Sequence, residues 1–308
     1  MAKYLHKCLD PEKHQLIANV SSGYRYWGTP ETETDNTLSS DDRPVTGGYV
    51  GTSFIVGGFA IVGQYSDRQY VNLAEEIYRN NGGSIPDLIA LYKATENQDY
   101  LTDLKAKVKE LISNTDGGLS QFRNLAEYIL AFPDTDEAKD IEKLARAKYE
   151  EILSICDRYF RVRQYIDSSG QKHYFRKYGH INDWYVGDSS EILDLAYTAI
   201  MLYRLGNVEA KQIAEDQLHW IFGLNPFDTS LMEGIGEHFV PCYHHRYNTL
   251  PGNWRGAVPG TVINGITRAF PWIDRPWLDL NPIPTGEFQC NEPWLPHNIR
   301  MLYVMSLW

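Results

Sequence analysis

Two polar clusters in the last third of the sequence contain the residue types that acid–base chemistry requires. The first is Tyr243-His244-His245-Arg246, which follows a loop punctuated by glycine. The second is the run from Gln289 to Asn298, with Glu292 near its middle. A carboxylic acid can give a proton to a leaving group, while imidazole and guanidinium groups donate hydrogen bonds to hydroxyl groups. Such side chains usually lie on loops that a rigid scaffold holds in place.

Each cluster also has an ordinary structural interpretation. An Asn-Glu pair is usually solvated surface, and His-His-Arg by itself is more often a polar loop or an ion-pair site. A metal site on His238, His244 and His245 would be a third interpretation. No cysteine or acidic ligand stands at a motif spacing from these histidines, so we expect no metal there.

Composition narrows the classes of partner. The chain has 308 residues, of which 43% are hydrophobic and 22% charged, as in ordinary globular proteins. Its net charge of -11 argues against a nucleic acid or an anionic membrane as partner. The 21 tyrosines and 8 tryptophans suit stacking on sugar rings, and they suit a packed core equally well. The 4 cysteines form no Cys-x-x-Cys pair, so a zinc or thioredoxin-type site is not expected.

Taken together, the two clusters resemble the signatures of glycoside hydrolase family 9, the inverting cellulases and endoglucanases. The residues at the spacing of the first signature are Ser230, Gly236, His244 and Arg246, and those at the spacing of the second are Phe288, Glu292 and Asn298. A glycine-rich stretch at 256–260 is similar to the family's connector between them. The residues that depart from the family pattern are Glu233, His238, Tyr243, Ile283, Trp294 and Ile299. The resemblance covers most of the chain, most firmly residues 188–308.

The resemblance implies roles for particular side chains. Glu292 would be the general acid that protonates the leaving oxygen, and the neighbouring Phe288, Pro293 and Trp294 would favour its protonated form. Asp279 would be an orienting carboxylate. The residues expected to bind substrate are His244, Arg246, Asn298, Trp294 and Trp27. The expected partner is a β-linked oligo- or polysaccharide, with no cofactor, and calcium sites stay open.

The general base of the family is missing from this sequence. An inverting glycosidase needs a second carboxylate, roughly 6.5–9.5 Å from the acid, to activate water. In the family this aspartate lies in an Asp-Ala-Gly-Asp motif, which does not occur here. Since residue 1 already resembles text from the middle of the family domain, we expect residues 1–308 to form a single catalytic domain that lacks its N-terminal portion. The first seven residues have no apolar segment of a signal peptide, so a secreted or periplasmic location would depend on a longer form.

Three functions follow from these observations. The leading one is cellulase-like hydrolysis of β-1,4-glucans, with little activity expected of the 308 residues alone. The second is a glycan-binding relative that has lost the base. The third is another α-barrel carbohydrate enzyme, such as an exo-acting β-glycosidase or a lyase.

The elements that must position these residues are predicted to be helices joined by short loops. Apolar periodicity predicts helices at 49–65, 67–80, 86–95, 99–113, 119–132, 134–159, 188–206 and 210–221. Asp134 and Asp188 would cap two of them, each with a glutamate three residues later. A hairpin is expected around Ser168-Ser169-Gly170. The pattern indicates an all-α protein, and the resemblance implies an (α/α)6 toroid, incomplete at its N-terminus. We expect His244, Arg246 and Glu292 to converge, and Cys242 and Cys290 to form a disulfide.

Overall fold

The computed structural model describes residues 2–17, 20–21, 45–46, 49–50, 53–114, 119–175, 187–241, 243–244, 259–268, 275–281 and 288–308. Three residues with predicted roles, Trp27, Cys242 and Arg246, lie outside these ranges. The chain divides into two compact units, Met1–Leu144 and Ala145–Trp308. The prediction of one domain over residues 1–308 therefore stays a prediction.

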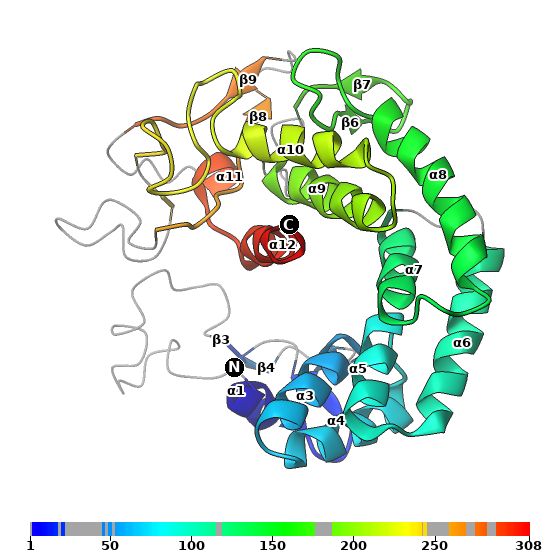
Figure 1. Ribbon diagram of the computed structural model, residues 1–308. Coiled ribbons are helices and arrows are strands. Elements are labelled where there is room, and N and C mark those ends of the chain that lie inside the picture. Colours follow the sequence, from blue (N-terminus) through cyan, green and yellow to red (C-terminus); the bar gives the residue numbers. More distant parts are fainter. Residues whose placement is uncertain are drawn as a thin grey trace, which may run out of the picture. The chain divides into compact units, whose positions relative to one another are not determined.

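The first unit consists mainly of helical hairpins (Figure 1). Its helices are α1 (Ala2–Lys7), α3 (Ser53–Tyr65), α4 (Gln69–Asn81), α5 (Ile85–Thr95), α6 (Gln98–Ser113) and α7 (Leu119–Ala131). Helix α3 packs against α4 and α5, and α5 also packs against α6 and α7. The short strands β1 (Leu9–Asp10), β2 (Gln15–Ile17) and β5 (Tyr49–Val50) form an antiparallel sheet, and β3 (Val20–Ser21) pairs with β4 (Val45–Thr46).

Helix α3 is packed closely because its glycines let two other helices approach. A Cβ added at Gly63 would lie 2.5 Å from the backbone nitrogen of Val71 in α4. On the other side, the backbone nitrogen of Gly57 donates to buried Asp87 of α5, at 2.7 Å. Asp87 also completes a capping box with Ser84, which starts α5. The prediction of a closely packed helix ending at Tyr65 agrees with this arrangement.

The second unit is built around α9 (Ser189–Arg204), which packs against both α10 (Ala210–Ile221) and α12 (Leu295–Leu307) (Figure 1). Most of α9 is buried, as its predicted apolar face requires. Helix α8 (Ala138–Ser154) crosses the boundary between the units, and α11 (Phe288–Asn291) is a single turn. Two ribbons complete the unit: β6 (Tyr165–Ile166) with β7 (Lys172–His173), and β8 (Thr267–Arg268) with β9 (Pro276–Trp277).

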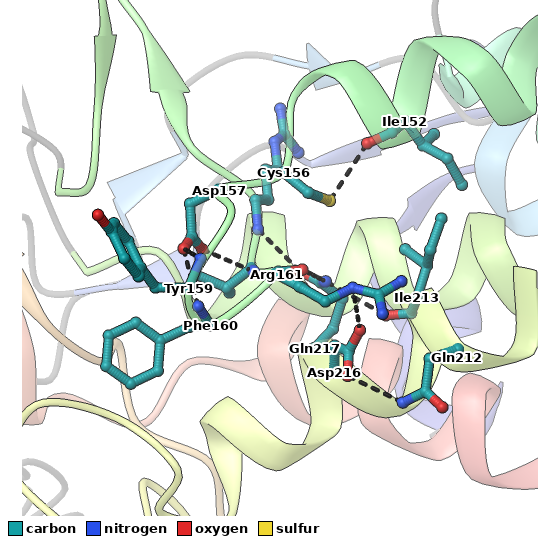
Figure 2. A network of polar contacts seen from close by, with 12 residues as sticks. Ile152, Cys156, Asp157, Tyr159, Phe160, Arg161, Gln212, Ile213, Asp216 and Gln217 are labelled. Carbon is teal, nitrogen blue, oxygen red and sulfur yellow. Dashed lines mark hydrogen bonds and ion pairs between the residues drawn. The ribbon is translucent and has the colours of Figure 1, made fainter.

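The loop that follows α8 is fixed to α10 by buried polar side chains (Figure 2). The carboxylate of Asp157 accepts hydrogen bonds from the backbone nitrogens of Tyr159, Phe160 and Val162, at 2.7–2.9 Å. Gln217 of α10, which is fully buried, bonds the loop with both ends of its amide. Its nitrogen donates to the carbonyl of Arg161, and its oxygen accepts from the backbone nitrogen of Arg163.

Three predicted details of helix starts are wrong. The helix predicted at 49–65 begins at Ser53, because Tyr49 and Val50 pair with β2 as strand β5. Helix α8 begins at Ala138 and ends at Ser154, inside the predicted 134–159, so Asp134 does not cap it. Asp188 does precede α9, but its side chain makes no capping hydrogen bond. Glu191 is instead paired with Arg163, at 2.6 Å, because the loop after α8 brings this arginine to the start of α9.

The described residues are otherwise mainly helical, as predicted, and the hairpin expected around Ser168-Ser169-Gly170 is β6–β7. Within the same residues, none of the helices is both long and apolar enough to cross a membrane.

Candidate active site

The turn α11, which precedes Glu292, is surrounded by three other segments of the second unit. Helix ends leave carbonyl groups without partners in the helix, and here other backbone nitrogens supply those partners. The hydrogen bonds run from Gly187 to the carbonyl of Gln289 (2.8 Å), from Gly265 to Cys290 (2.9 Å), from His244 to Asn291 (3.2 Å) and from Asn264 to Glu292 (3.0 Å). Residues up to 105 positions apart in the sequence are thereby fixed around one turn (292 − 187 = 105).

Two glycines make this close approach possible. A Cβ at Gly187 would lie 2.2 Å from the carbonyl oxygen of Gly265. Gly265 itself has a φ of +96°, and its Cβ would lie 2.3 Å from the hydroxyl of Ser189. Any side chain at either position would push apart the segments that hold α11.

Glu292 is half-buried, and its carboxyl is held from one side. The indole nitrogen of Trp294 donates a hydrogen bond to Oε2 of Glu292. Trp294 is the residue before α12 and has an extended backbone conformation. Its indole N–H is engaged with the predicted general acid, and the predicted contact of Trp294 with substrate stays a prediction.

Behind Trp294 lies a histidine that sequence reasoning missed. The imidazole of His297 is parallel to the indole of Trp294, with 5.9 Å between the ring centroids and 3° between the planes. His297 is 1% exposed, and its Nε2 lies 2.5 Å from Oδ1 of Asn264. Burial, helped by the positive charge of Arg300, lowers the pKa of His297 to about 4. The imidazole is therefore neutral at neutral pH.

His244 lies beside the same turn. Its backbone nitrogen bonds Asn291, the residue before Glu292. Its ring is 6.3 Å from the ring of Phe288, the first residue of α11. The loop of the first predicted signature and the turn of the second are thus adjacent, while the predicted contact of His244 with sugar stays a prediction. Arg246 lies outside the described residues, so its predicted convergence is untested.

Asn298 and Asp279, two further candidates, make hydrogen bonds that join segments next to Glu292. The amide of Asn298 accepts from the backbone nitrogen of Val262 (2.9 Å) and donates to the carbonyls of Val262 (3.3 Å) and Trp294 (2.8 Å). Asp279 is buried, and its carbonyl accepts from the side chain of Asn291 at 2.9 Å. Its carboxylate accepts from the backbone nitrogen of Asn281 at 3.0 Å. Substrate binding by Asn298 and orientation by Asp279 stay predictions.

Other predicted features of the site fall partly outside the described residues. Trp27 is one of them, and so is Cys242, the predicted disulfide partner of Cys290. The sulfur of buried Cys290 accepts a hydrogen bond from the backbone nitrogen of Asp279, at 3.3 Å. In the part of the chain that the structure describes, no three His, Cys, Asp or Glu side chains gather as metal ligands.

In the second unit, the half-buried Glu292 follows a turn that is hydrogen-bonded to the loop of His244. The chain belongs to glycosyl hydrolase family 9, whose model matches residues 82–305. A search of curated proteins gave no match.

Solved structures of the same family share the fold. A metagenome-derived family 9 endoglucanase is 16% identical, with a TM-score of 0.70, over 99% of this chain and 59% of its own. AaCel9A, solved with cellobiose-like isofagomine, is 15% identical, with a TM-score of 0.70, over 99% and 63%. Endoglucanase CelQ from Clostridium thermocellum, complexed with cellobiose and cellotriose, is 16% identical, with a TM-score of 0.62, over 98% and 54%.

These similarities confirm the predicted fold class, since family 9 endoglucanases are (α/α)6 barrels of helical hairpins. The chain spans about three-fifths of the length of the structures it matches, at 61% and 59% of the first two. Whether the toroid is incomplete at its N-terminus stays a prediction.

Proposed function

We propose that this chain supplies the general acid and part of the sugar-binding cleft of an inverting, cellulase-type β-1,4-glucanase. One observation supports this most: the turn that bears Glu292 is held by the backbone of His244, so that the two family signatures meet. The family match and the sugar complexes of similar endoglucanases support the substrate class, a β-linked glucan. A polysaccharide is too large to enter a cell, so we also propose a secreted or periplasmic location.

In the proposed reaction, Glu292 gives its proton to the glycosidic oxygen while the bond from that oxygen to the anomeric carbon breaks. Because Oε2 accepts the indole hydrogen bond, the transferable proton would be on Oε1. His244 and Arg246 would donate hydrogen bonds to sugar hydroxyl groups near the cleaved bond. In the same displacement, water would attack the opposite face of the sugar ring as that bond breaks, and it needs a second carboxylate to take its proton.

The Asp-Ala-Gly-Asp motif of the family base does not occur in the 308 residues. General base catalysis is worth about 10²–10⁴-fold, so we expect these 308 residues by themselves to hydrolyse β-1,4-glucans very slowly. A glycan-binding relative is one alternative. An exo-acting β-glycosidase is the other alternative, and it would release products only from chain ends.

Azide tests the acid without requiring a base, because this anion attacks the anomeric carbon without first losing a proton. We would incubate the chain with azide and cellopentaose, whose leaving group needs protonation, or with 2,4-dinitrophenyl β-cellobioside, whose leaving group does not. We expect α-glycosyl azides from both substrates. Glu292→Gln should lower the yield from cellopentaose by about 10²–10⁴-fold and leave the dinitrophenyl reaction nearly unchanged.

Glu237→Gln is a matched control, because Glu237 is exposed on the loop that leads to His244. If neither substrate gives a glycosyl azide while calorimetry detects cellopentaose binding, the glycan-binding alternative replaces the enzyme. If Glu292→Gln affects both substrates equally, Glu292 is not the acid. The lengths of the products released from longer glucans would separate endo from exo action.

A further inference from the structure

To act as an acid, the carboxyl of Glu292 must be held in an orientation that faces the bound sugar. A glutamate side chain has several rotamers, and a half-buried one is free to turn away from a bound sugar. Among the described residues, one side-chain donor limits that freedom, because the indole N–H of Trp294 donates a hydrogen bond to Oε2. The quality of this hydrogen bond depends on how firmly the indole itself is held.

The indole is held by a parallel ring. The imidazole of buried His297 is parallel to the indole of Trp294, with 3° between the planes and 5.9 Å between the ring centroids. Trp294 and His297 are three positions apart across the start of α12, so the rigid first turn of the helix fixes their spacing.

His297 is in turn fixed by Asn264. The side-chain nitrogen of Asn264 donates to the carbonyl of Phe288 at 2.8 Å, which identifies Oδ1 as the atom that faces the imidazole. An amide oxygen only accepts, so Nε2 of His297 carries the ring proton. Among the described residues, buried Nδ1 has no hydrogen-bond partner, which agrees with a neutral ring whose proton is on Nε2.

The series of contacts returns to Glu292, because the backbone nitrogen of Asn264 donates to the carbonyl of Glu292 at 3.0 Å. Glu292, Trp294, His297 and Asn264 thus form what we call the contact cycle. We infer that Trp294 is a positioning residue for Glu292, kept in place by His297 and Asn264 rather than by substrate. The inference rests on the proposed function for its catalytic meaning, though not for its geometry.

The hydrogen bond can be tested without any activity. In protein labelled with ¹⁵N-tryptophan, Trp294→Phe identifies the indole resonance of Trp294 by its loss. We expect Glu292→Ala to move that resonance upfield and to speed its exchange with solvent by about tenfold, the size of effect expected for one lost hydrogen bond. Glu237→Ala, on an exposed loop, should leave it unchanged. A Trp294 resonance that ignores Glu292→Ala would overturn the inference.

The rest of the cycle is tested in the same spectra. His297→Leu removes both the parallel ring and the bond to Asn264, and should speed exchange of the Trp294 indole although Glu292 is present. His297→Phe keeps the ring and should fall between His297→Leu and the wild type. The other indole resonances show whether each variant is folded. Equal exchange in wild type and His297→Leu would mean that His297 does not hold the indole.

The catalytic meaning needs a separate measurement. Trp294→Phe keeps an aromatic ring but removes the N–H. We expect azide-dependent cleavage of cellopentaose to fall by about tenfold, with cellopentaose affinity changed by less than about twofold. A sugar-stacking role would instead weaken binding and leave cleavage of the bound sugar unchanged, which would refute the positioning role. If the wild-type chain cleaves nothing, the proposed function fails, while the indole resonance still decides the geometric inference.

Discussion

Two acidic side chains of the second unit, Asp157 and Glu292, are held in opposite ways. Asp157 is 5% exposed and accepts three hydrogen bonds from the backbone of its own loop (Figure 2). Glu292 is half-buried, and the hydrogen bond described for its carboxyl comes from one side chain, Trp294. An ionised carboxylate offers about four acceptor positions. In Asp157, three of these positions accept hydrogen bonds from its own loop. In Glu292, one position accepts the described hydrogen bond, and the others can accept hydrogen bonds from a bound molecule.

Both carboxyl groups have polar surroundings. Near Asp157, the amide of Gln217 is bonded at both ends, and Asp216 pairs with Arg161 at 3.0 Å and with Gln212 at 2.9 Å (Figure 2). Among the described residues, each network holds a buried atom without a hydrogen-bond partner: Oδ2 of Asp216 in one and Nδ1 of His297 in the other. The difference between the two carboxyl groups therefore lies in their own hydrogen bonds and exposure.

The largest expected effect is the loss of stability on replacing Asp157. Asp157→Ala leaves three backbone N–H groups of a buried loop without acceptors, and should lower the free energy of unfolding by about 3–5 kcal/mol. Glu292→Ala should lower it by less than about 1 kcal/mol, because one half-exposed hydrogen bond is lost. Urea titrations of both variants measure the difference. Equal losses would remove the distinction between the two carboxyl groups.

Asp167 is a matched control for Asp157. It also accepts from the backbone nitrogens of two following residues, Ser169 and Gln171, at 2.9 and 3.0 Å. Its side chain is 29% exposed, and it also contacts the Ser169 hydroxyl and His173, so water can partly replace it as acceptor. Asp167→Ala should therefore destabilise the chain much less than Asp157→Ala, and a similar loss would mean that burial is not the reason.

Most of the helices could be predicted from the sequence. The ranges 99–113 and 210–221 match α6 (Gln98–Ser113) and α10 (Ala210–Ile221) to within one residue at either end, because their apolar stripes are regular and short loops limit them. Capping was predicted less well. Glu191 has the spacing of a capping box but pairs with Arg163, and no local pattern predicts a partner 28 residues away.

Less of the candidate site could be predicted. The sequence signatures identified His244 and Glu292, which the structure places on neighbouring segments. They did not identify Asn264 or His297, although an asparagine that follows the apolar Val262-Ile263 and a histidine three positions after Trp294 were visible signals. The contacts of Asn264 with Phe288 and with His297 join residues that are 24 and 33 positions apart in the sequence, and periodicity says nothing about such pairs.

The next expected effect concerns pH. Unfolded histidine binds a proton near pH 6.5, whereas His297 in the folded chain does so near pH 4, because it is buried and faces Arg300. The stabilisation is fully present above pH 6.5 and is lost as the pH falls through 4, since only the unfolded chain gains the proton in between. A shift of this size is worth about 3 kcal/mol.

His297→Gln isolates this contribution, because a glutamine amide can donate to Asn264 but does not titrate. Between pH 7 and pH 4, wild type should lose about 3 kcal/mol more of its free energy of unfolding than the variant. Urea unfolding at several pH values measures both curves. Parallel curves would show that His297 is not kept neutral by the contact cycle.

A smaller effect tests the close approach around α11. A methyl group at Gly187 would meet the carbonyl oxygens of Asn264 and Gly265 at 2.4 and 2.2 Å, so Gly187→Ala should cost about 1–3 kcal/mol of stability. Gly58 in α3 is the control, because its added Cβ would meet no atom within 4 Å. Gly58→Ala should stabilise the helix by about 1 kcal/mol. Thermal unfolding of both variants should therefore shift in opposite directions.

The smallest effect separates the two causes of the low pKa of His297. Burial is the larger cause, and the charge of Arg300 is the smaller. Arg300 also pairs with Asp194 at 2.7 Å, in a partly exposed ion pair worth about 1 kcal/mol or less. Arg300→Met should therefore cost little stability at pH 7. It should also make the loss of stability in acid slightly smaller, because folded His297 would bind its proton at a higher pH. If the pH dependence instead disappears, charge rather than burial keeps His297 neutral, and the contact cycle would depend on Arg300 for its neutral histidine.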